Sequence, residues 1–187
     1  MTGGAWKSTT SLAVSGQTLL PNTATPVGLS RGPSAVAALP YGTGPGTASQ
    51  IVSLTYVLAP GSSVTLNLFD GSLRDMAGDQ ANMRLLRAYA IWISAGGDAS
   101  GVTVGNAGAD PHPLFGGSGA QTKTVYPGGE PDCGGGGAIA GVPVTSAACN
   151  VKIANNSPTA FATVEVNFAG TQCVPGAAMG PLGCVYP

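Results

Sequence analysis

The chain has 187 residues, of which 8% are charged, and its formal net charge at pH 7 is −1. This length suits a single domain, but typical soluble domains are roughly 25% charged, so few charged side chains are left to solvate a free monomer. The seven Lys and Arg residues are scattered along the sequence, which excludes the clustered basic surface that binding to nucleic acid requires. Either the chain is an extracellular coat material, or much of its surface is buried against other subunits.

Residues 1–50 are rich in Gly, Pro, Ser and Thr and poor in large apolar side chains, so we expect them to form an extended arm. Ordering such an arm costs ~1–2 kcal/mol per residue, which contacts with another surface must offset, and a neighbouring subunit is the simplest candidate for that surface. The candidate subunit contacts are the large apolar residues of the arm, Trp6, Leu12, Val14, Leu19 and Leu20.

Beyond the arm, the sequence alternates apolar and polar residues, which is typical of β-strands with one buried face. Residues 52–58 and 64–68 show this alternation, and Pro60-Gly61 separates them. Residues 73–83 are the one stretch in which we expect a helix or an irregular turn. Residues 84–94 (RLLRAYAIWIS) predict a long apolar strand, although their leucines and alanines would also suit a helix.

The second half of the chain predicts shorter strands between Gly and Pro residues, at positions 102–104, 122–126 and 142–144. The glycine run at 134–137 is expected to be a loop, because four consecutive glycines do not suit a regular element.

The clearest strand signal comes last, at residues 150–154 and 160–169. The residues between them, Asn155-Asn-Ser-Pro-Thr159, are of the types that turns prefer, so these two strands are expected to form a β-hairpin. Lys152 and Glu165 are expected to pair across that hairpin.

Together these elements predict an all-β chain with about eight short strands. We expect a single antiparallel β-sandwich, or a jelly-roll-like variant of it, over residues 51–171. The arm at 1–50 precedes it, and a tail rich in Cys, Pro and Gly at 172–187 follows it.

All four cysteines, Cys133, Cys149, Cys173 and Cys184, are candidates for disulfides. Their spacing does not match paired C-x-x-C zinc motifs, and a single His cannot complete a mixed site, so we expect no metal and no cofactor. Two interpretations stay open: buried or idle thiols, and disulfides that form after release from a reducing cell. A pairing of Cys173 with Cys184 is favoured, because the Pro- and Gly-rich segment between them can turn back on itself.

No catalytic motif is found in the sequence. His112, the only histidine, lies between two prolines in what we expect to be a rigid loop, and no G-x-S-x-G nucleophile motif occurs. Asp70 precedes Gly71 at a strand end, where Asp is favoured for its own backbone hydrogen bonds. Asp75 and Asp79 do not follow the spacing of a Ca²⁺-binding loop. We therefore expect no catalytic residues.

Trp6 and Trp92 are the residues that could stack on a sugar, as in carbohydrate-binding modules. Trp92 lies within an apolar strand and is expected in the core, whereas Trp6 is expected to anchor the arm to a subunit surface.

The sequence also predicts no association with a membrane. No apolar stretch approaches the ~20 residues of a spanning helix. The first residues do not follow the pattern of a secretory signal, so we expect synthesis in a cytoplasm.

Five stretches of the sequence, taken in order, resemble a known group of proteins. They are residues 66–71 (LNLFDG), Asp75-x-x-Gly78, the aromatic strand at 84–93, residues 101–108 (GVTVGNAG) and residues 150–156 (NVKIANN). In order and spacing they resemble small β-sandwich proteins encoded beside capsid genes in tailed phages and prophages. The resemblance implies a virion component that decorates or cements a capsid, or that builds a tail or spike. The cysteines and both arms depart from the short form of this pattern, so no role is transferred to them.

Composition and resemblance together predict a virion structural protein, most closely a capsid decoration or cement subunit, made in the host cytoplasm. Its expected partners are the major capsid protein or other virion subunits, and further copies of itself. A trimer is favoured among homo-oligomers, because closed rings remove exposed sheet edges. The alternatives are an extracellular adhesive or carbohydrate-binding module, a phage tail or spike component and, more remotely, a hydrolase built around His112.

Overall fold

The computed structural model of the chain describes residues 48–172, apart from positions 116, 118, 130–131 and 135–140. For Cys133, and for five short strands outside this range, the structure describes only the backbone. These outer strands form a three-stranded sheet, in the order β2–β1–β3, and the pair β15–β16. Their bounds are Gly4–Ser8 (β1), Leu12–Ser15 (β2), Ala38–Leu39 (β3), Ala178–Gly180 (β15) and Gly183–Val185 (β16).

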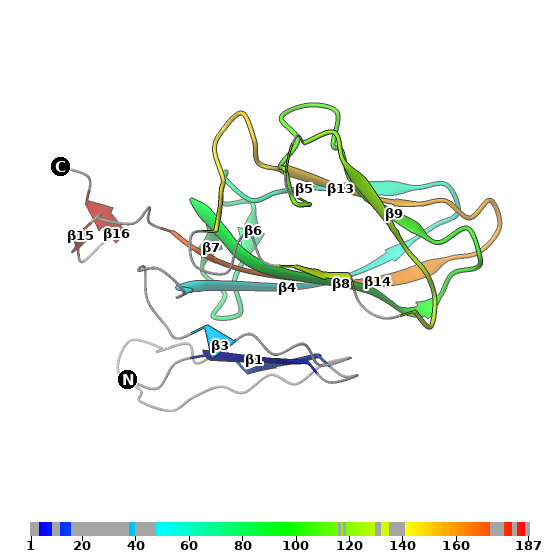
Figure 1. Cartoon of the computed structure of the whole chain (residues 1–187), viewed down its shortest axis with the longest axis horizontal. Coiled ribbons are helices and arrows are strands. Elements are labelled where there is room, and N and C mark those ends of the chain that lie inside the picture. Colours follow the sequence, from blue (N-terminus) through cyan, green and yellow to red (C-terminus); the bar gives the residue numbers. More distant parts are fainter. Residues whose placement is uncertain are drawn as a thin grey trace.

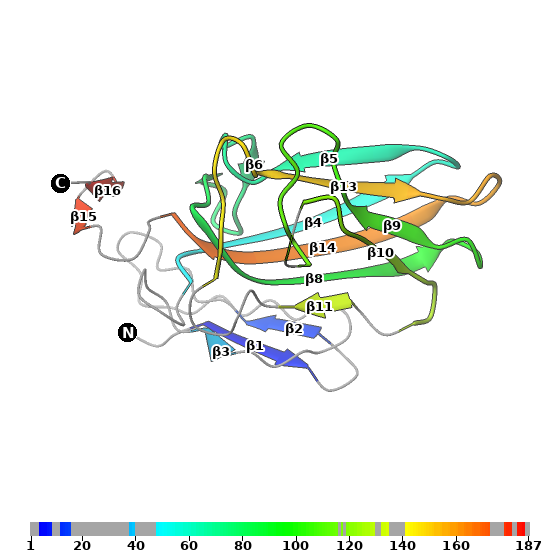
Figure 2. The same ribbon diagram turned by 45° about the horizontal axis from the view of Figure 1, so that its top comes forward.

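The described residues form two antiparallel sheets packed as a sandwich, with no helix among them, as the sequence predicts (Figure 1). The first sheet has the order β11–β8–β14–β4, with β12 also paired to β8, and the second has the order β10–β9–β13–β5. Figure 2 shows them as two layers. The strands of the sandwich are Gln50–Leu58 (β4), Ser63–Asn67 (β5), Leu85–Gly96 (β8), Val102–Gly105 (β9), Thr122–Val125 (β10), Asp132–Gly134 (β11), Val142–Pro143 (β12), Asn150–Asn155 (β13) and Ala162–Thr171 (β14).

Alternating apolar side chains fill the space between the two sheets. On β14, Val164, Val166 and Phe168 are fully buried, and they belong to one apolar cluster with Ile91 of β8 and Ile153 of β13. The period-two pattern in the sequence therefore identified the inward-facing residues of β14, because successive side chains of a strand point to opposite faces.

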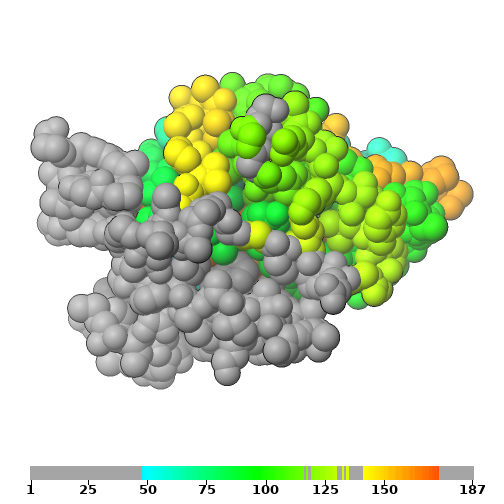
Figure 3. Space-filling view, in the orientation of Figure 1, coloured from blue at the N-terminus to red at the C-terminus, as the bar shows by residue number. Residues whose placement is uncertain are grey.

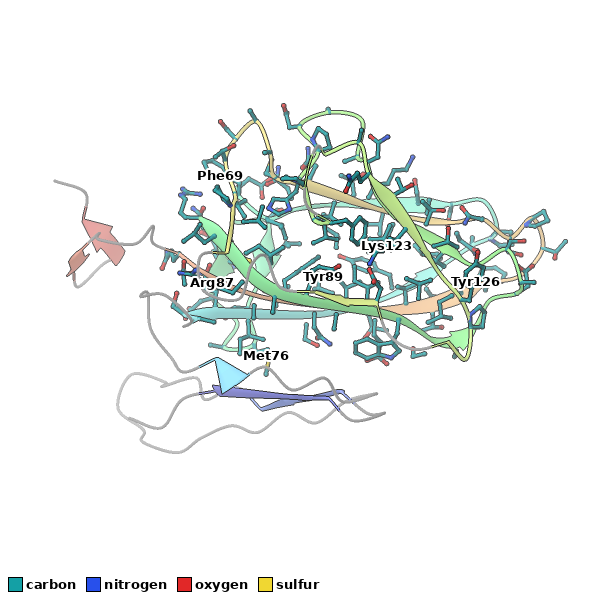
Figure 4. The ribbon with its side chains drawn as sticks, in the orientation of Figure 1. Phe69, Met76, Arg87, Tyr89, Lys123 and Tyr126 are labelled. Atoms are coloured by element: carbon teal, nitrogen blue, oxygen red, sulfur yellow. The ribbon has the colours of Figure 1, made fainter. Side chains whose placement is uncertain are left out.

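Strand β8 is buried on both of its faces over most of its length. Trp92 is buried, but it belongs to a second cluster with Ala88, Ala90 and Ala169, separate from the one between the sheets. The prediction that Trp92 lies in the core is therefore confirmed, and the cluster that it joins is the smaller of the two. Met76 packs against the same cluster, and Figure 4 shows it on the side of the first sheet that faces away from the second.

The predicted hairpin between residues 150–154 and 160–169 does not form. Strand β13 pairs with β5 and β9, whereas β14 pairs with β4 and β8, so the two strands lie in different sheets. The alternation of a strand determines which face it buries but not which strand lies beside it, and the same turn residues can join strands of two sheets.

The expected pair of Lys152 and Glu165 is wrong for the same reason. Lys152 lies opposite Thr65 on β5, and Glu165 lies opposite Thr55 on β4 and Trp92 on β8.

Residues 73–83 contain an irregular turn rather than a helix. Leu73–Arg74 (β6) and Gln80–Ala81 (β7) form a short antiparallel pair. Asp75 Oδ1 accepts hydrogen bonds from the backbone N–H groups of Ala77, at 2.9 Å, and Asp79, at 3.0 Å. Such side-chain bonds to the local backbone compete with a helix.

Candidate subunit-binding surface

The sandwich has two sides on which its sheets end, and the strands that form them differ in character. On one side the edge strands are β10 and β11, and we call it the closed side. On the other they are the consecutive strands β4 and β5, and we call it the open side. An edge strand presents unpaired N–H and C=O groups, so its protection decides whether another chain can pair with it.

Charged side chains bridge the closed side. Lys123 of β10 forms an ion pair with Asp132 of β11, with Nζ and Oδ1 2.8 Å apart. Lys123 also lies over the ring of Phe115, 5.2 Å from its centre, and Phe115 meets Tyr89 edge to face at 5.8 Å. The Tyr89 hydroxyl donates to Asp132 at 3.4 Å. Figure 4 shows Tyr89 and Lys123 together at this side, and β10 with its flanking loops faces the viewer in yellow-green in Figure 3.

Strand β4, on the open side, lacks the charges, the prolines and the bulge that normally protect an edge, and the described residues cover only its beginning, at Ile51. Its nine residues (QIVSLTYVL) include no charge, no Pro and no Gly. It pairs with β14 from Gln50 to Leu58 without a shift of register, so no bulge twists the edge away. Natural edge strands are usually short, charged, bulged or covered. By these criteria β4 is available for pairing with another strand.

Two hydrogen bonds show which backbone groups of β4 face away from β14. The Ser94 hydroxyl of β8 donates to the carbonyl of Thr163, so the odd-numbered residues of β14 direct their backbone groups toward β8 and the even-numbered ones toward β4. From outside the sheet, the Met76 N–H donates to the carbonyl of Ile51 at 2.9 Å. Even-numbered residues of β4 lie opposite even-numbered residues of β14 and direct their backbone groups toward that strand. The backbone groups of the odd-numbered residues of β4 therefore point to the free edge.

Three of these residues, Ser53, Thr55 and Val57, make up what we call the β4 edge. Because backbone groups alternate along a strand, their N–H and C=O groups point the same way as the carbonyl of Ile51. Within the part of the chain that the structure describes, no hydrogen bond is made to these groups on that edge. All three side chains are exposed.

Exposed apolar side chains lie at the same end of the sandwich as Val57. Val57 is 69% exposed and lies opposite Thr163, and Phe161, two residues before Thr163 along the chain, is 60% exposed. Tyr126 is 53% exposed, and it lies at the end of the molecule on the right of Figure 4. Aromatic residues are enriched in the cores of protein interfaces, and charged ones are depleted. Val57 and Phe161 therefore give this end of the open side the composition of a protein contact, whereas Tyr126 directly follows β10 of the closed side.

The predicted subunit contacts of the arm are placed only in part. Trp6 lies opposite Val14, and Leu12 opposite Ser8, in the β1–β2 pair. Of the side chains of these three candidates the structure says nothing, and Leu19 and Leu20 lie outside the described residues. Sequence analysis missed the β4 edge, because the alternation of residues 52–58 does not show that this strand ends its sheet.

The cysteines are likewise placed in part. Cys149 is a buried free thiol, and burial is the main cause that raises its pKa, which suits the interpretation of an idle thiol. Cys133 lies on β11 opposite Ala90, and Cys184 lies on β16 opposite Met179, both as backbone alone. Cys173 lies outside the described residues, so the pairing of Cys173 with Cys184 stays a prediction.

Sites of other kinds find little support in the described residues. They contain no group of three or more His, Cys, Asp or Glu side chains placed to hold a metal ion. They also contain no apolar helix of membrane-spanning length. Trp92 is only 4% exposed, so it presents no ring face to a sugar.

His112 is buried, at 1% exposure, and within the described residues neither of its ring nitrogens has a hydrogen-bond partner. Burial lowers its pKa to about 4, and the nearby carbonyls of Pro143 and Val142 oppose this only in part. A neutral, enclosed imidazole fits the predicted structural role better than a role in acid–base catalysis.

We expect His112 to make the fold sensitive to acid. The unfolded chain takes up this proton near pH 6.5 and the folded chain only near pH 4, so stability is complete above pH 6.5 and falls as the pH drops toward 4. The expected loss is about 3 kcal/mol, at 1.36 kcal/mol for each unit of pKa difference. Urea unfolding at several pH values should show this loss in the native chain but not in His112→Phe. An imidazole pKa near 6.5 in the folded chain, measured by NMR, would contradict the prediction.

Comparison with protein-family models, with curated proteins and with solved structures finds no match for this chain.

Proposed function

We propose that this chain is a non-catalytic virion structural protein, most closely a capsid decoration or cement subunit, that holds neighbouring protein subunits together. The observation that carries the proposal is the β4 edge, a long, uncharged and unprotected strand edge beside exposed apolar side chains. Pairing with another subunit would satisfy its backbone groups, as in β-strand addition. The low charge of the whole chain supports the same role.

The asymmetry of the sandwich also supports this proposal. The closed side carries Lys123 and Asp132, which discourage pairing with another strand, whereas the open side carries no charge on either edge strand. A protein that worked as a free monomer would gain from charges on both sides. A chain that binds its neighbours through one side needs charged side chains on the other side only.

A direct test is the protein content of purified virus particles from a host that carries the gene. The proposal predicts that mass spectrometry finds the chain in the particles, at a constant ratio to the major capsid protein, and that the ratio survives further purification. Its absence from particles, while it accumulates elsewhere in the same cells, would contradict the proposal.

Removal of residues 1–40 tests the contribution of the arm. We expect the shortened chain to keep its β-sandwich, because both core clusters of the described residues are built from strands that the deletion leaves in place. We also expect it to bind particles more weakly than the complete chain. Co-sedimentation with particles measures the binding, and circular dichroism checks the fold. Equal binding by both chains would contradict the role of the arm and leave the β4 edge as the contact.

Carbohydrate binding is the second candidate, and the exposed rings of Phe161 and Tyr126 are the observation that favours it. Aromatic rings can stack on sugars, as in carbohydrate-binding modules. A glycan array should discriminate: binding that is lost in both Phe161→Ala and Tyr126→Ala would favour this candidate over the first.

A further inference from the structure

We infer that the β4 edge pairs with the β4 edge of a second copy of this chain, antiparallel and about a two-fold axis. The inference rests on the proposed function, since it names the partner of the surface on which that function depends. It would join the first sheets of two sandwiches into one continuous sheet across the contact.

The backbone groups of the β4 edge are self-complementary in this arrangement. With the axis at Thr55, Ser53 lies opposite Val57 of the other copy, and Thr55 lies opposite its own equivalent. The outward N–H and C=O groups of these residues then form the hydrogen-bonded pairs of an antiparallel ladder. A two-fold contact uses the same patch on both copies, and a strand edge with three equally spaced free residues meets that condition.

The side chains on the two faces also fit a second copy. On the outer face, Thr55 meets Thr55, a favourable cross-strand pair, and no charge on β4 opposes its own copy. On the inner face, Leu54 and Tyr56 pack against the core but stay partly exposed. In the paired arrangement Leu54 lies opposite Tyr56 of the other copy, so both side chains become more deeply buried.

The β6–β7 turn limits the register of the pairing. Because the Met76 N–H already occupies the carbonyl of Ile51, the beginning of β4 is covered. A second strand can therefore pair only from Ser53 onward, and this centres the contact near Thr55. The closed-side edges of a second copy are poorer partners, since β10 and β11 have four and three residues and carry Lys123 and Asp132. The remaining edge strand, β5, is uncharged but has five residues against the nine of β4.

The inferred contact differs in symmetry from the trimer that was favoured because closed rings remove exposed sheet edges. Pairing of β4 with itself closes after two copies, so it gives a dimer or an assembly built from dimers. A three-fold ring would need β4 to pair with a different edge of its neighbour.

Substitutions at Thr55 test the inference, because two equal charges would then lie directly opposite each other. The mass of the native chain in solution, measured by light scattering after size-exclusion chromatography, should be that of a dimer. Thr55→Lys alone and Thr55→Glu alone should each weaken the dimer roughly a hundredfold or more. An equimolar mixture of the two variants should restore the dimer, because the opposite charges then attract.

Thr122→Lys is the matched control, since it adds the same charge at an exposed position of the closed-side edge strand β10. It should remain a dimer, and thermal unfolding should show that all variants are folded. The inference is overturned by a monomeric native chain, by a dimer that persists in Thr55→Lys, or by a mixture that stays monomeric. A monomeric chain that still occurs in particles would overturn this inference and leave the proposed function in place.

Discussion

Replacement of Phe168 by Ala is expected to lower the free energy of unfolding by about 3–5 kcal/mol. Phe168 is completely buried on β14, opposite Val52 of β4 and Tyr89 of β8. The substitution would leave a cavity between the two sheets, next to the middle of the first sheet. Because β14 is held by ladder hydrogen bonds to β4 on one side and β8 on the other, these strands cannot move to fill the cavity.

Phe161→Ala is the matched control for Phe168→Ala. Phe161 lies just before the same strand, but its side chain is 60% exposed, so the same change of residue should cost less than about 1 kcal/mol. Urea unfolding measures both losses. Similar losses in the two variants would contradict the described packing of β14.

Replacement of Asn155 by Ala is expected to cost roughly 2–4 kcal/mol, because each buried group left without a partner costs about 1–3 kcal/mol. The Asn155 side-chain amide donates to the carbonyls of Leu58 and Ala59, both at 3.1 Å, and of Ala160, at 2.8 Å. Its Oδ1 accepts from the N–H of Ser157 at 3.1 Å. This one side chain thus ties the end of β4 to the connection between β13 and β14.

Two further variants sharpen that prediction. Asn155→Asp has nearly the same shape, but its carboxylate would face three carbonyl oxygens, so at neutral pH it should be at least as destabilising as Asn155→Ala. Asn156→Ala removes an exposed amide that bonds Ser100 and Thr103, and it should cost about 1 kcal/mol or less. Chemical unfolding of an Asn155→Asp chain as stable as the native one would contradict the described hydrogen bonds.

Much of the fold could be predicted from the sequence, because alternation reports directly on burial. The alternation at residues 52–58 predicted β4, and the apolar run at 84–94 predicted β8. Which strands are neighbours depends on contacts between distant residues, and periodicity carries no information about them. The wrong hairpin between residues 150–154 and 160–169 and the wrong pair of Lys152 and Glu165 both follow from that limit.

The candidate site was harder to predict than the fold for the same reason. Ser53, Thr55 and Val57 are ordinary members of an alternating strand, and they become a candidate binding surface only because β4 ends its sheet. Lys123 and Asp132 are nine residues apart in the sequence, and only the strand order shows that they bridge the closed side. The residue types alone did show that 8% of the residues are charged, and this low charge is the basis for proposing contacts with other subunits.

Amide hydrogen exchange at Ser53, Thr55 and Val57 tests the central claim most directly. We expect fast exchange at these three N–H groups in chain diluted to the monomer, because they face water, and strong protection once the chain is assembled with its partner subunits. The N–H groups of Leu54 and Tyr56, which face β14, should be protected in both states and serve as the internal reference. Equal exchange at Ser53, Thr55 and Val57 in the free and assembled chain would show that subunits bind elsewhere.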